Sequence, residues 1–311
     1  NLLDKELDLE FLHCSADSKS LDGIILVDHN IAVLDGMAPH ILDPKFPGCI
    51  DEIVNLGEYW DEEGIRKSKD KIMDIQGRIS SCYRRGYSYL KAAQSIRDGI
   101  EKAYLKTVDV HQVDLITEDI YNAVFKDIEL KKKARLRKLF ASAITPDGAV
   151  NFLDHLFKDM RQKYIITGPP GTYKSTLLKR ILDYAINKGL DIEAFYCPMN
   201  YERIEHIIIK DLQIGFITSV KPHVLNPDNI RRDDIIIDMN KTIDPSKLSG
   251  YEEALKQDNA AYWNLFDGAI ASLSSITPLH DELELYYVHN MDFSKIDRIT
   301  EYLLSKIMKY L

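Results

Sequence analysis

The chain has 311 residues, of which 45% are hydrophobic and 29% charged, and its formal net charge at pH 7 is −9. Apolar and charged residues are interspersed along the chain, which is typical of a globular protein with a sizeable core and excludes a disordered one. The excess of acidic side chains would repel a nucleic-acid backbone, so we do not expect nucleic acid as a partner.

No apolar run approaches the roughly 18 residues that cross a bilayer, and the N-terminus lacks the basic and then apolar pattern of a secretory signal. The four cysteines lie far apart, without the close spacing of a zinc site: Cys14, Cys49, Cys82 and Cys197. We therefore predict a cytoplasmic protein that has no membrane segment and whose cysteines are reduced thiols.

An internal repeat organises the chain. Residues 1–61 align without a gap with residues 184–244, at an offset of 183. The two segments are identical at sixteen positions, where ordinary composition gives about four. We therefore predict two related α/β modules, residues 1–138 and residues 139–311, joined by long helices.

The first module begins with short apolar runs at 9–14, 24–27 and 31–34, whose length and β-branched residues are typical of strands. Long helical patterns follow over 62–106 and 117–140. The second of these includes a basic run at 131–138, which we interpret as a solvated helix surface, with a patch for an anionic partner as the alternative.

The second module repeats this pattern and extends it. We predict helices over 149–160 and 177–188 and from residue 294 to the end. The predicted strands are 164–167, 192–197, 207–209, 214–217, 235–237 and 285–288.

The strongest chemical signal lies between the strand at 164–167 and the helix at 177–188. It is a phosphate-binding loop with the residues Gly168, Pro169, Pro170, Gly171, Thr172, Tyr173, Lys174, Ser175 and Thr176. Such a loop directs several backbone N–H groups and a helix N-terminus at a triphosphate. We expect Gly171 to let the backbone approach the ligand closely.

The side chains of this loop have separate expected roles. Lys174 would be the catalytic residue, placing a positive charge on the β- and γ-phosphates. Ser175 would bind Mg²⁺, and Thr176 would support the α-phosphate. Tyr173 stands where the P-loop pattern has glycine, and if this residue has a positive φ the tyrosine costs on the order of 1 to 2 kcal/mol. A degenerate loop that binds only inorganic anions or nothing is the alternative.

An acidic residue at a strand end is expected near the Mg²⁺. Asp238, which closes the apolar run 235–237, is the predicted metal-binding residue in the second module. In the first module Asp35 has a similar setting, but its counterpart in the repeat is Thr218.

Two further features are open to both a structural and a functional interpretation. The pair Pro39-His40 recurs as Pro222-His223 and is either a structural turn or a phosphate contact. Arg231 and Arg232 could act as phosphate clamps or as an arginine finger across an interface, but surface arginines are common.

The chain resembles a family of tandem P-loop ATPases from Gram-positive bacteria. The segments that carry the resemblance are Leu12–Gly23, Ala32–His40, Val54–Asp61 and Leu139–Gly148, besides the loop itself. The resemblance implies two fused P-loop NTPase modules with mostly parallel sheets, and it implies no substrate. Both the resemblance and the repeat offset predict that the first module is truncated at its N-terminus here, with its own P-loop upstream of Asn1.

These observations predict a Mg-dependent, ATP-binding P-loop NTPase, in which hydrolysis drives a rearrangement of the two modules. ATP is preferred because Asn240-Lys241-Thr242-Ile243 begins like the guanine-reading motif but lacks its aspartate. A kinase for a small molecule or nucleotide and a non-catalytic nucleotide-sensing scaffold are the alternatives. Besides the nucleotide, self-association or a protein partner remains open.

Overall fold

The computed structural model describes residues 5, 7–37, 41–129 and 132–311. The chain divides into two compact units, residues 1–84 with 272–311 and residues 85–271. The division falls inside two long helices, α2 (Lys69–Leu105) and α7 (Glu252–Ser274). The predicted mixed α/β fold is confirmed, and the module boundary between residues 138 and 139 stays a prediction.

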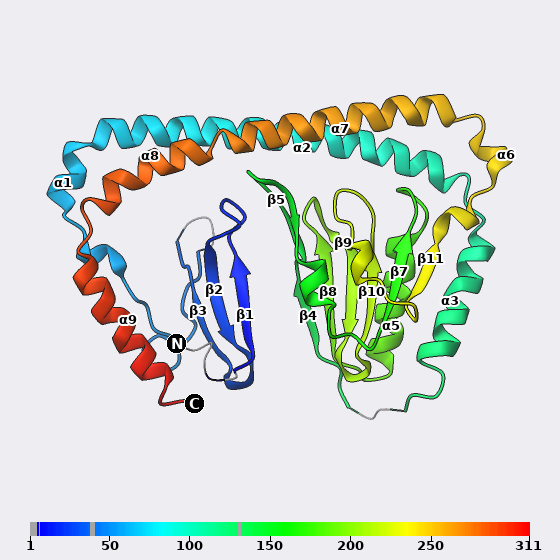
Figure 1. The fold of residues 1–311 in the computed structure, drawn as a ribbon, viewed down its shortest axis with the longest axis horizontal. Coiled ribbons are helices and arrows are strands. Elements are labelled where there is room, and N and C mark those ends of the chain that lie inside the picture. The colour runs from blue at the N-terminus through cyan, green and yellow to red at the C-terminus, as the bar shows by residue number, and fades with distance from the viewer. Residues whose placement is uncertain (1–4, 6, 38–40, 130–131) are drawn as a thin grey trace. The chain divides into compact units, whose positions relative to one another are not determined.

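A six-stranded sheet with the order β11-β7-β10-β9-β8-β4 forms the centre of the second unit (Figure 1). Its strands are β4 (Leu136–Leu139), β7 (Gln162–Thr167), β8 (Ile192–Cys197), β9 (Asn200–Ile209), β10 (Ile214–Thr218) and β11 (Ile235–Asp238). Within this sheet β9 runs antiparallel to both neighbours, and the other pairs are parallel. The carboxyl ends of the five remaining strands therefore meet at one edge.

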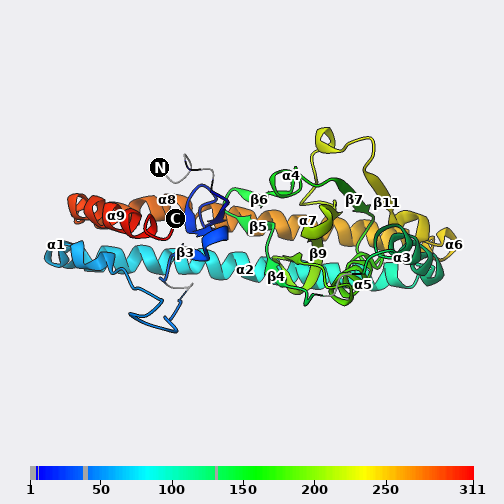
Figure 2. The same cartoon turned by 90° about the horizontal axis from the view of Figure 1, so that it is seen from below.

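Apolar side chains alternate between the two faces of this sheet, as the pleat of a strand requires. Tyr164 and Ile166 of β7 belong to a core with the helices α3 (Val110–Val124) and α5 (Lys174–Asn187), which lie side by side in Figure 2. Ile165, between them in the sequence, packs on the other face against Leu153 and Phe157. These lie in and just after the short helix α4 (Leu153–Leu156).

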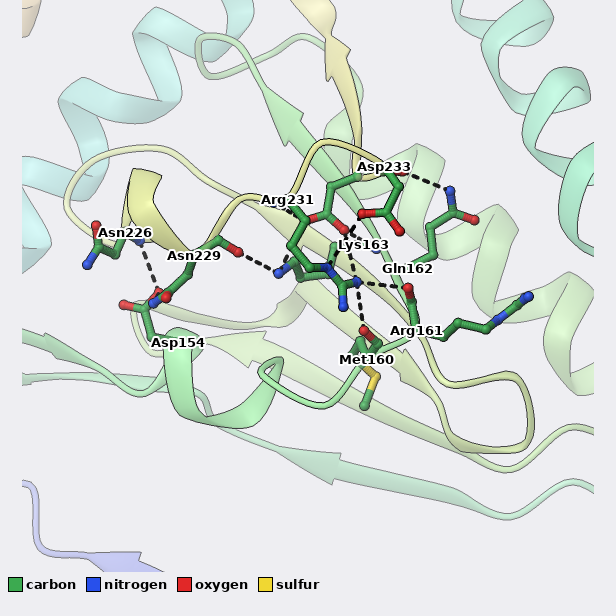
Figure 3. Close-up of polar contacts among 10 residues, drawn as sticks. Asp154, Met160, Arg161, Gln162, Lys163, Asn226, Asn229, Arg231 and Asp233 are labelled. Atoms are coloured by element: carbon green, nitrogen blue, oxygen red, sulfur yellow. Dashed lines mark hydrogen bonds and ion pairs between the residues drawn. The ribbon is translucent and has the colours of Figure 1, made fainter.

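A buried ion pair ties β7 to the loop before β11 at the amino ends of these strands (Figure 3). The carboxylate of Asp234 is fully buried and lies 3.2 Å from Nζ of Lys163. It also accepts hydrogen bonds from the backbone N–H of Lys163 at 3.0 Å and of Arg231 at 2.8 Å. Burial alone would raise the pKa of Asp234, but these hydrogen bonds and the Lys163 ammonium hold it below its usual value.

Replacing Lys163 by methionine leaves the Asp234 carboxylate buried without its lysine partner, and we expect the free energy of unfolding to fall by about 3 kcal/mol. Arg135→Met is the matched control, because Arg135 pairs with Asp191 while its own side chain is 85% exposed. An exposed pair of this kind contributes under about 1 kcal/mol. Urea denaturation of both variants measures the difference, and equal losses would contradict an anchoring role for the buried pair.

Helices α2 and α7 pack against each other within the second unit. Their shared core contains Ala93 and Ile100 of α2 and Leu255, Tyr262 and Phe266 of α7. The short helix α6 (Pro245–Leu248) precedes α7, and a two-stranded hairpin, β5 (Ser142–Thr145) and β6 (Gly148–Asn151), contributes apolar side chains to the same cluster.

The first unit contains a three-stranded antiparallel sheet, β1 (Leu9–His13), β2 (Leu21–Leu26) and β3 (Ile31–Leu34). Its helices are α1 (Glu62–Lys67), α8 (Thr277–Val288) and α9 (Phe293–Ile307), with the outer parts of α2 and α7. The backbone N–H of Asp61 donates to the carbonyl of Asn290 at 2.7 Å, and that of Asp292 donates to Tyr59 at 3.0 Å. The two sequence-distant parts of this unit are therefore joined by backbone hydrogen bonds.

The repeated segments have the same strand register. Leu9 pairs with Leu26 in the first copy, and Ile192 pairs with Ile209, 183 residues further on, in the second. A three-residue 3₁₀ turn follows in each copy and ends in a left-handed residue, Asn30 with φ 54° or Gln213 with φ 53°. The structure thus supports the internal repeat, while a P-loop belonging to the first module stays a prediction.

Most of the predicted helices and strands are confirmed, but three predictions are wrong. The helix predicted over 117–140 ends with α3 at Val124, and its basic run leads into the edge strand β4. There Arg137 pairs with Glu193 of β8, at 2.7 Å, so the charges follow a sheet edge and not a helix surface. Lys131, within that run, lies outside the described residues.

In the other two wrong predictions, strand residues were predicted as helix at 149–160 and helix residues as strand at 285–288. Most of the helix predicted over 149–160 is replaced by β6, α4 and a turn. The strand predicted at 285–288 is instead the last turn of α8, in which Leu279 and Leu283 are buried four residues apart while Leu285 and Val288 are exposed. Helical periodicity, set by burial on one side of α8, overrides the local apolar run.

Two coarser predictions agree with the structure. The four cysteines are free thiols. In the described part of the chain no helix has the length and apolar character needed to cross a bilayer.

Candidate phosphate-binding site

The predicted phosphate-binding loop connects the carboxyl end of β7 to the first residue of α5. Three of its residues have positive φ: Gly168 at 127°, Gly171 at 81° and Tyr173 at 60°. Lys174 begins α5, so the N–H groups of its first turn have no acceptor within the helix and face the side of the loop. This is the strand, loop and helix arrangement that the sequence predicts.

Tyr173 occupies the left-handed conformation that glycine adopts without cost. It is the N-cap of α5, with φ 60° and ψ 16°, and its side chain makes no capping hydrogen bond. The expected strain of about 1 to 2 kcal/mol therefore applies to this residue. Its ring packs against the core between α3, α5 and the sheet, which offsets part of this strain.

Lys174 is folded back into its own loop. Its Nζ donates hydrogen bonds to the carbonyls of Gly168 at 2.8 Å and Pro169 at 2.5 Å. Burial lowers the pKa of Lys174 to about 7, and the charge of Arg97 acts in the same direction, whereas Glu101 raises it. A phosphate group would compete with two loop carbonyls for this ammonium.

The remaining loop residues are positioned by short contacts. Thr172 is fully buried and its Oγ1 donates to the carbonyl of Pro169 at 2.8 Å. Pro169 and Pro170 carry no N–H group, so after Gly168 the backbone donors of the loop come from Gly171 onward. Ser175 and Thr176 lie in the first turn of α5, the former half-buried and the latter exposed.

Helix α2 lies directly against this loop. A Cβ atom at Gly171 would overlap the backbone carbonyl of Glu101 in α2. The Glu101 carboxylate pairs with Nη1 and Nη2 of Arg203, from β9, at 2.7 and 3.1 Å. It also lies 3.7 Å from Nε of Arg97. Gly171 therefore allows a close approach of helix and loop, in addition to any role toward phosphate.

Replacing Gly171 by alanine should destabilise the protein by at least about 2 kcal/mol, because its Cβ meets the Glu101 carbonyl and its φ of 81° disfavours alanine. Gly99→Ala is the matched control, since Gly99 is exposed on α2, the helix of Glu101, with open space around it. There the alanine should stabilise α2 by about 1 kcal/mol. Thermal and urea unfolding would show the opposite signs, and a Gly171→Ala variant as stable as the parent would refute the close contact.

The carboxyl end of β11 lies beside the start of the loop. Asp238 pairs in register with Thr167, the residue before Gly168. A Cβ at Gly168 would lie 2.9 Å from Cβ of Met239, so this glycine permits the approach. Hydrogen bonds from the side chain and backbone of Asn240 hold the pKa of Asp238 below its usual value, so this carboxylate is ionised at neutral pH.

An ionised carboxylate at this strand end and the Ser175 hydroxyl are the hard oxygen donors that Mg²⁺ takes alongside phosphate oxygens and water. The described residues contain no cluster of three His, Cys, Asp or Glu side chains that could hold a metal ion. A Mg²⁺ ion here would consequently depend on the nucleotide for part of its coordination.

The burial of Lys174 predicts how the free energy of unfolding changes with pH. Its pKa is near 10.5 in the unfolded chain and about 7 in the folded protein, so the unfolded chain holds the proton more tightly. The resulting destabilisation is fully present below pH 7 and is relieved as the pH rises towards 10.5. The stability of the parent relative to Lys174→Met should therefore increase across this window, by up to about 1.4 kcal/mol per pH unit.

Chemical denaturation at several pH values measures this difference. Lys179→Met, on the same helix, is the control because the Lys179 ammonium is exposed and pairs with Asp183 at 2.6 Å. This variant therefore removes the same kind of charge without removing a buried one. A pH profile for Lys174→Met that matches the profile for Lys179→Met would show that the loop lysine is not buried in the folded protein.

Other predicted site residues lie elsewhere. Arg231 is at the opposite end of β7, where its Nη2 donates to the carbonyls of Met160 and Arg161 at 2.8 Å (Figure 3), so the structure does not bring it to the loop. Asp35 belongs to the first unit and follows β3. Pro39 and His40 lie outside the described residues, whereas His223 is buried in the loop after β10.

Sequence reasoning missed the charged residues around Lys174. Arg97 and Glu101 come from α2, and Arg203 and Glu205 come from β9. Their charges all act on the pKa of Lys174. A weak signal exists in β9, where polar and apolar residues alternate around Ile204, but nothing in the local sequence of α2 indicates proximity to the loop.

Comparison of the chain with protein-family models, with curated proteins and with solved structures finds no match. The resemblance to tandem P-loop ATPases stays a prediction. Function is therefore inferred from the loop and the residues around it.

Proposed function

We propose that this protein is a Mg-dependent, ATP-binding P-loop NTPase that hydrolyses its nucleotide. One observation carries the proposal: the loop Gly168–Thr176 joins the carboxyl end of β7, a strand with parallel neighbours on both sides, to the N-terminus of α5, with Lys174 as the first helical residue. Backbone N–H groups, the helix dipole and the lysine charge then point to one anionic ligand.

In this proposal Ser175 and Asp238 would hold Mg²⁺ beside the loop, together with the nucleotide phosphates. Bound there, the ion would neutralise charge on the phosphates during transfer of the terminal phosphoryl group. Lys174 would bind and orient that group, and the first-turn N–H groups of α5 would bind the remaining phosphate oxygens.

Nucleotide binding in this proposal is coupled to helix α2. The contact of Gly171 with the Glu101 backbone leaves no room for an added methyl group on that side of the loop. A ligand that draws Lys174 and the loop towards phosphate acts on a packed helix. Because α2 continues from the second unit into the first, its displacement would carry the nucleotide state along the chain and drive the rearrangement of the two modules.

A non-catalytic nucleotide sensor is the second candidate, and the strained Tyr173 favours it. A left-handed tyrosine next to the lysine restricts how the loop adjusts around phosphate. The same contact between loop and α2 would then report nucleotide binding without turnover.

The test is calorimetric titration of Mg-ATP and Mg-GTP into the full chain, with release of inorganic phosphate measured in parallel. We expect saturable ATP binding that is weakened at least about tenfold by Lys174→Ala, because the lysine carries the phosphate charge. Lys179→Ala should bind like the parent. Binding without phosphate release would favour the sensor, and equal binding by the Lys174→Ala variant would contradict a nucleotide site at this loop.

A further inference from the structure

A small cavity of about 30 Å³ lies in the second unit at the edge of the sheet that carries the loop. Its wall includes Cys197 and Thr218, the last residues of β8 and β10, whose carboxyl ends lie at that edge. Arg97 and Glu205 also line the cavity. Thr218 pairs in register with Ile166 of β7, two residues before Gly168, so the cavity lies beside the strand that leads into the loop.

Polar atoms in this wall lack partners. Thr218 and His223 are each more than nine-tenths buried. Among the described residues nothing forms a hydrogen bond with Oγ1 of Thr218 or Nδ1 of His223. A buried polar group without a partner costs about 1 to 3 kcal/mol, so two of them around one cavity call for a polar occupant.

The size of the cavity selects the occupant. A buried water needs roughly 10 to 15 Å³ of such volume, so a cavity of about 30 Å³ holds about two waters. A metabolite that accepts a phosphoryl group would not fit. The cavity thus favours transfer of a phosphoryl group to water over transfer to a small-molecule acceptor.

Glu205 is the one carboxylate among the described residues that line this cavity. Burial raises its pKa, although the Cys197 thiol, Arg97 and Arg203 each act to lower it. Burial also raises the pKa of Cys197 to about 11, so this thiol is protonated and donates to the Glu205 carboxylate. A carboxylate with a raised pKa takes a proton from water more readily than an ordinary one.

We propose that this cavity holds the water that attacks the terminal phosphate of the nucleotide, and that Glu205 is the catalytic base that accepts its proton. The water oxygen forms a bond to the γ-phosphorus. The bond from that phosphorus to the bridging oxygen breaks, and its electron pair leaves with the nucleoside diphosphate. The proton passes to Glu205, and the products are a nucleoside diphosphate and inorganic phosphate.

This inference rests on the proposed function, and two measurements on the full chain separate them. Mg-ATP binding is measured by calorimetry and inorganic phosphate release by a steady-state assay. The variants are Glu205→Gln, Thr218→Val and the control Glu202→Gln, which makes the same change at an exposed residue of the same strand.

Glu205→Gln should lower phosphate release at least about 100-fold while the affinity for Mg-ATP changes by less than about threefold. The control should match the parent in both. Thr218→Val removes a hydroxyl that has no partner among the described residues, so it should unfold close to the parent's midpoint and yet release phosphate more slowly. A slower rate at unchanged stability keeps the inference testable if Glu205→Gln folds poorly.

Phosphate release within tenfold of the parent in Glu205→Gln would overturn the role of Glu205 and leave the proposed function standing. An unchanged rate in Thr218→Val would overturn the cavity as the site of the attacking water. A parent chain that binds Mg-ATP and releases no phosphate would overturn this inference together with hydrolysis. A parent chain that binds no nucleotide would overturn the proposed function itself.

Discussion

The position of β7 between β10 and β11 is the constraint on which the candidate site depends. At its amino end the buried pair of Lys163 and Asp234 joins the strand to the loop before β11. At its carboxyl end Gly168 packs against Met239. A slip of one residue would turn Tyr164 and Ile166 to the wrong face of the sheet and move Thr167 away from Asp238. The loop and the acidic strand end therefore share one fixed register.

The same unit packs helix α2 against the loop. Glu101 contacts Gly171 through its backbone and Arg203 through its side chain, so the helix is held over the loop by packing and by charge. A ligand could shift this packing only by the difference between its affinities for the packed and the displaced helix. Under the proposed function, the stability of the packed arrangement would lower the apparent affinity for nucleotide.

The fold could be predicted from the sequence where the signals are local. The strand, loop and helix from Gln162 to Asn187 follow from adjacent residues, and the positive φ that would strain Tyr173 could be stated as a condition beforehand. The basic residues at 135 and 137 could not be placed on a sheet from local sequence, because their partners, Asp191 and Glu193, lie at the start of β8, more than fifty residues away.

The candidate site shows the same limit. Gly168 to Thr176 and Asp238 are found by pattern, because a strand and the residues that follow it define their places. Arg97 and Glu205 could not be found in this way, since α2 and β9 meet the loop only through tertiary packing. The internal repeat predicts the position of β9 better than its local sequence does, because the register of β1 and β2 is preserved in β8 and β9.

Pro169 and Pro170 have a consequence for the thermodynamics of binding. Two adjacent pyrrolidine rings restrict the loop backbone before any ligand arrives, so little conformational entropy is left for the ligand to remove there. Under the proposed function, the ordering cost and the change in buried apolar area would then arise outside these two residues, among other places where α2 contacts Gly171. The heat capacity change on nucleotide binding would consequently report the movement of a helix more than the folding of a loop.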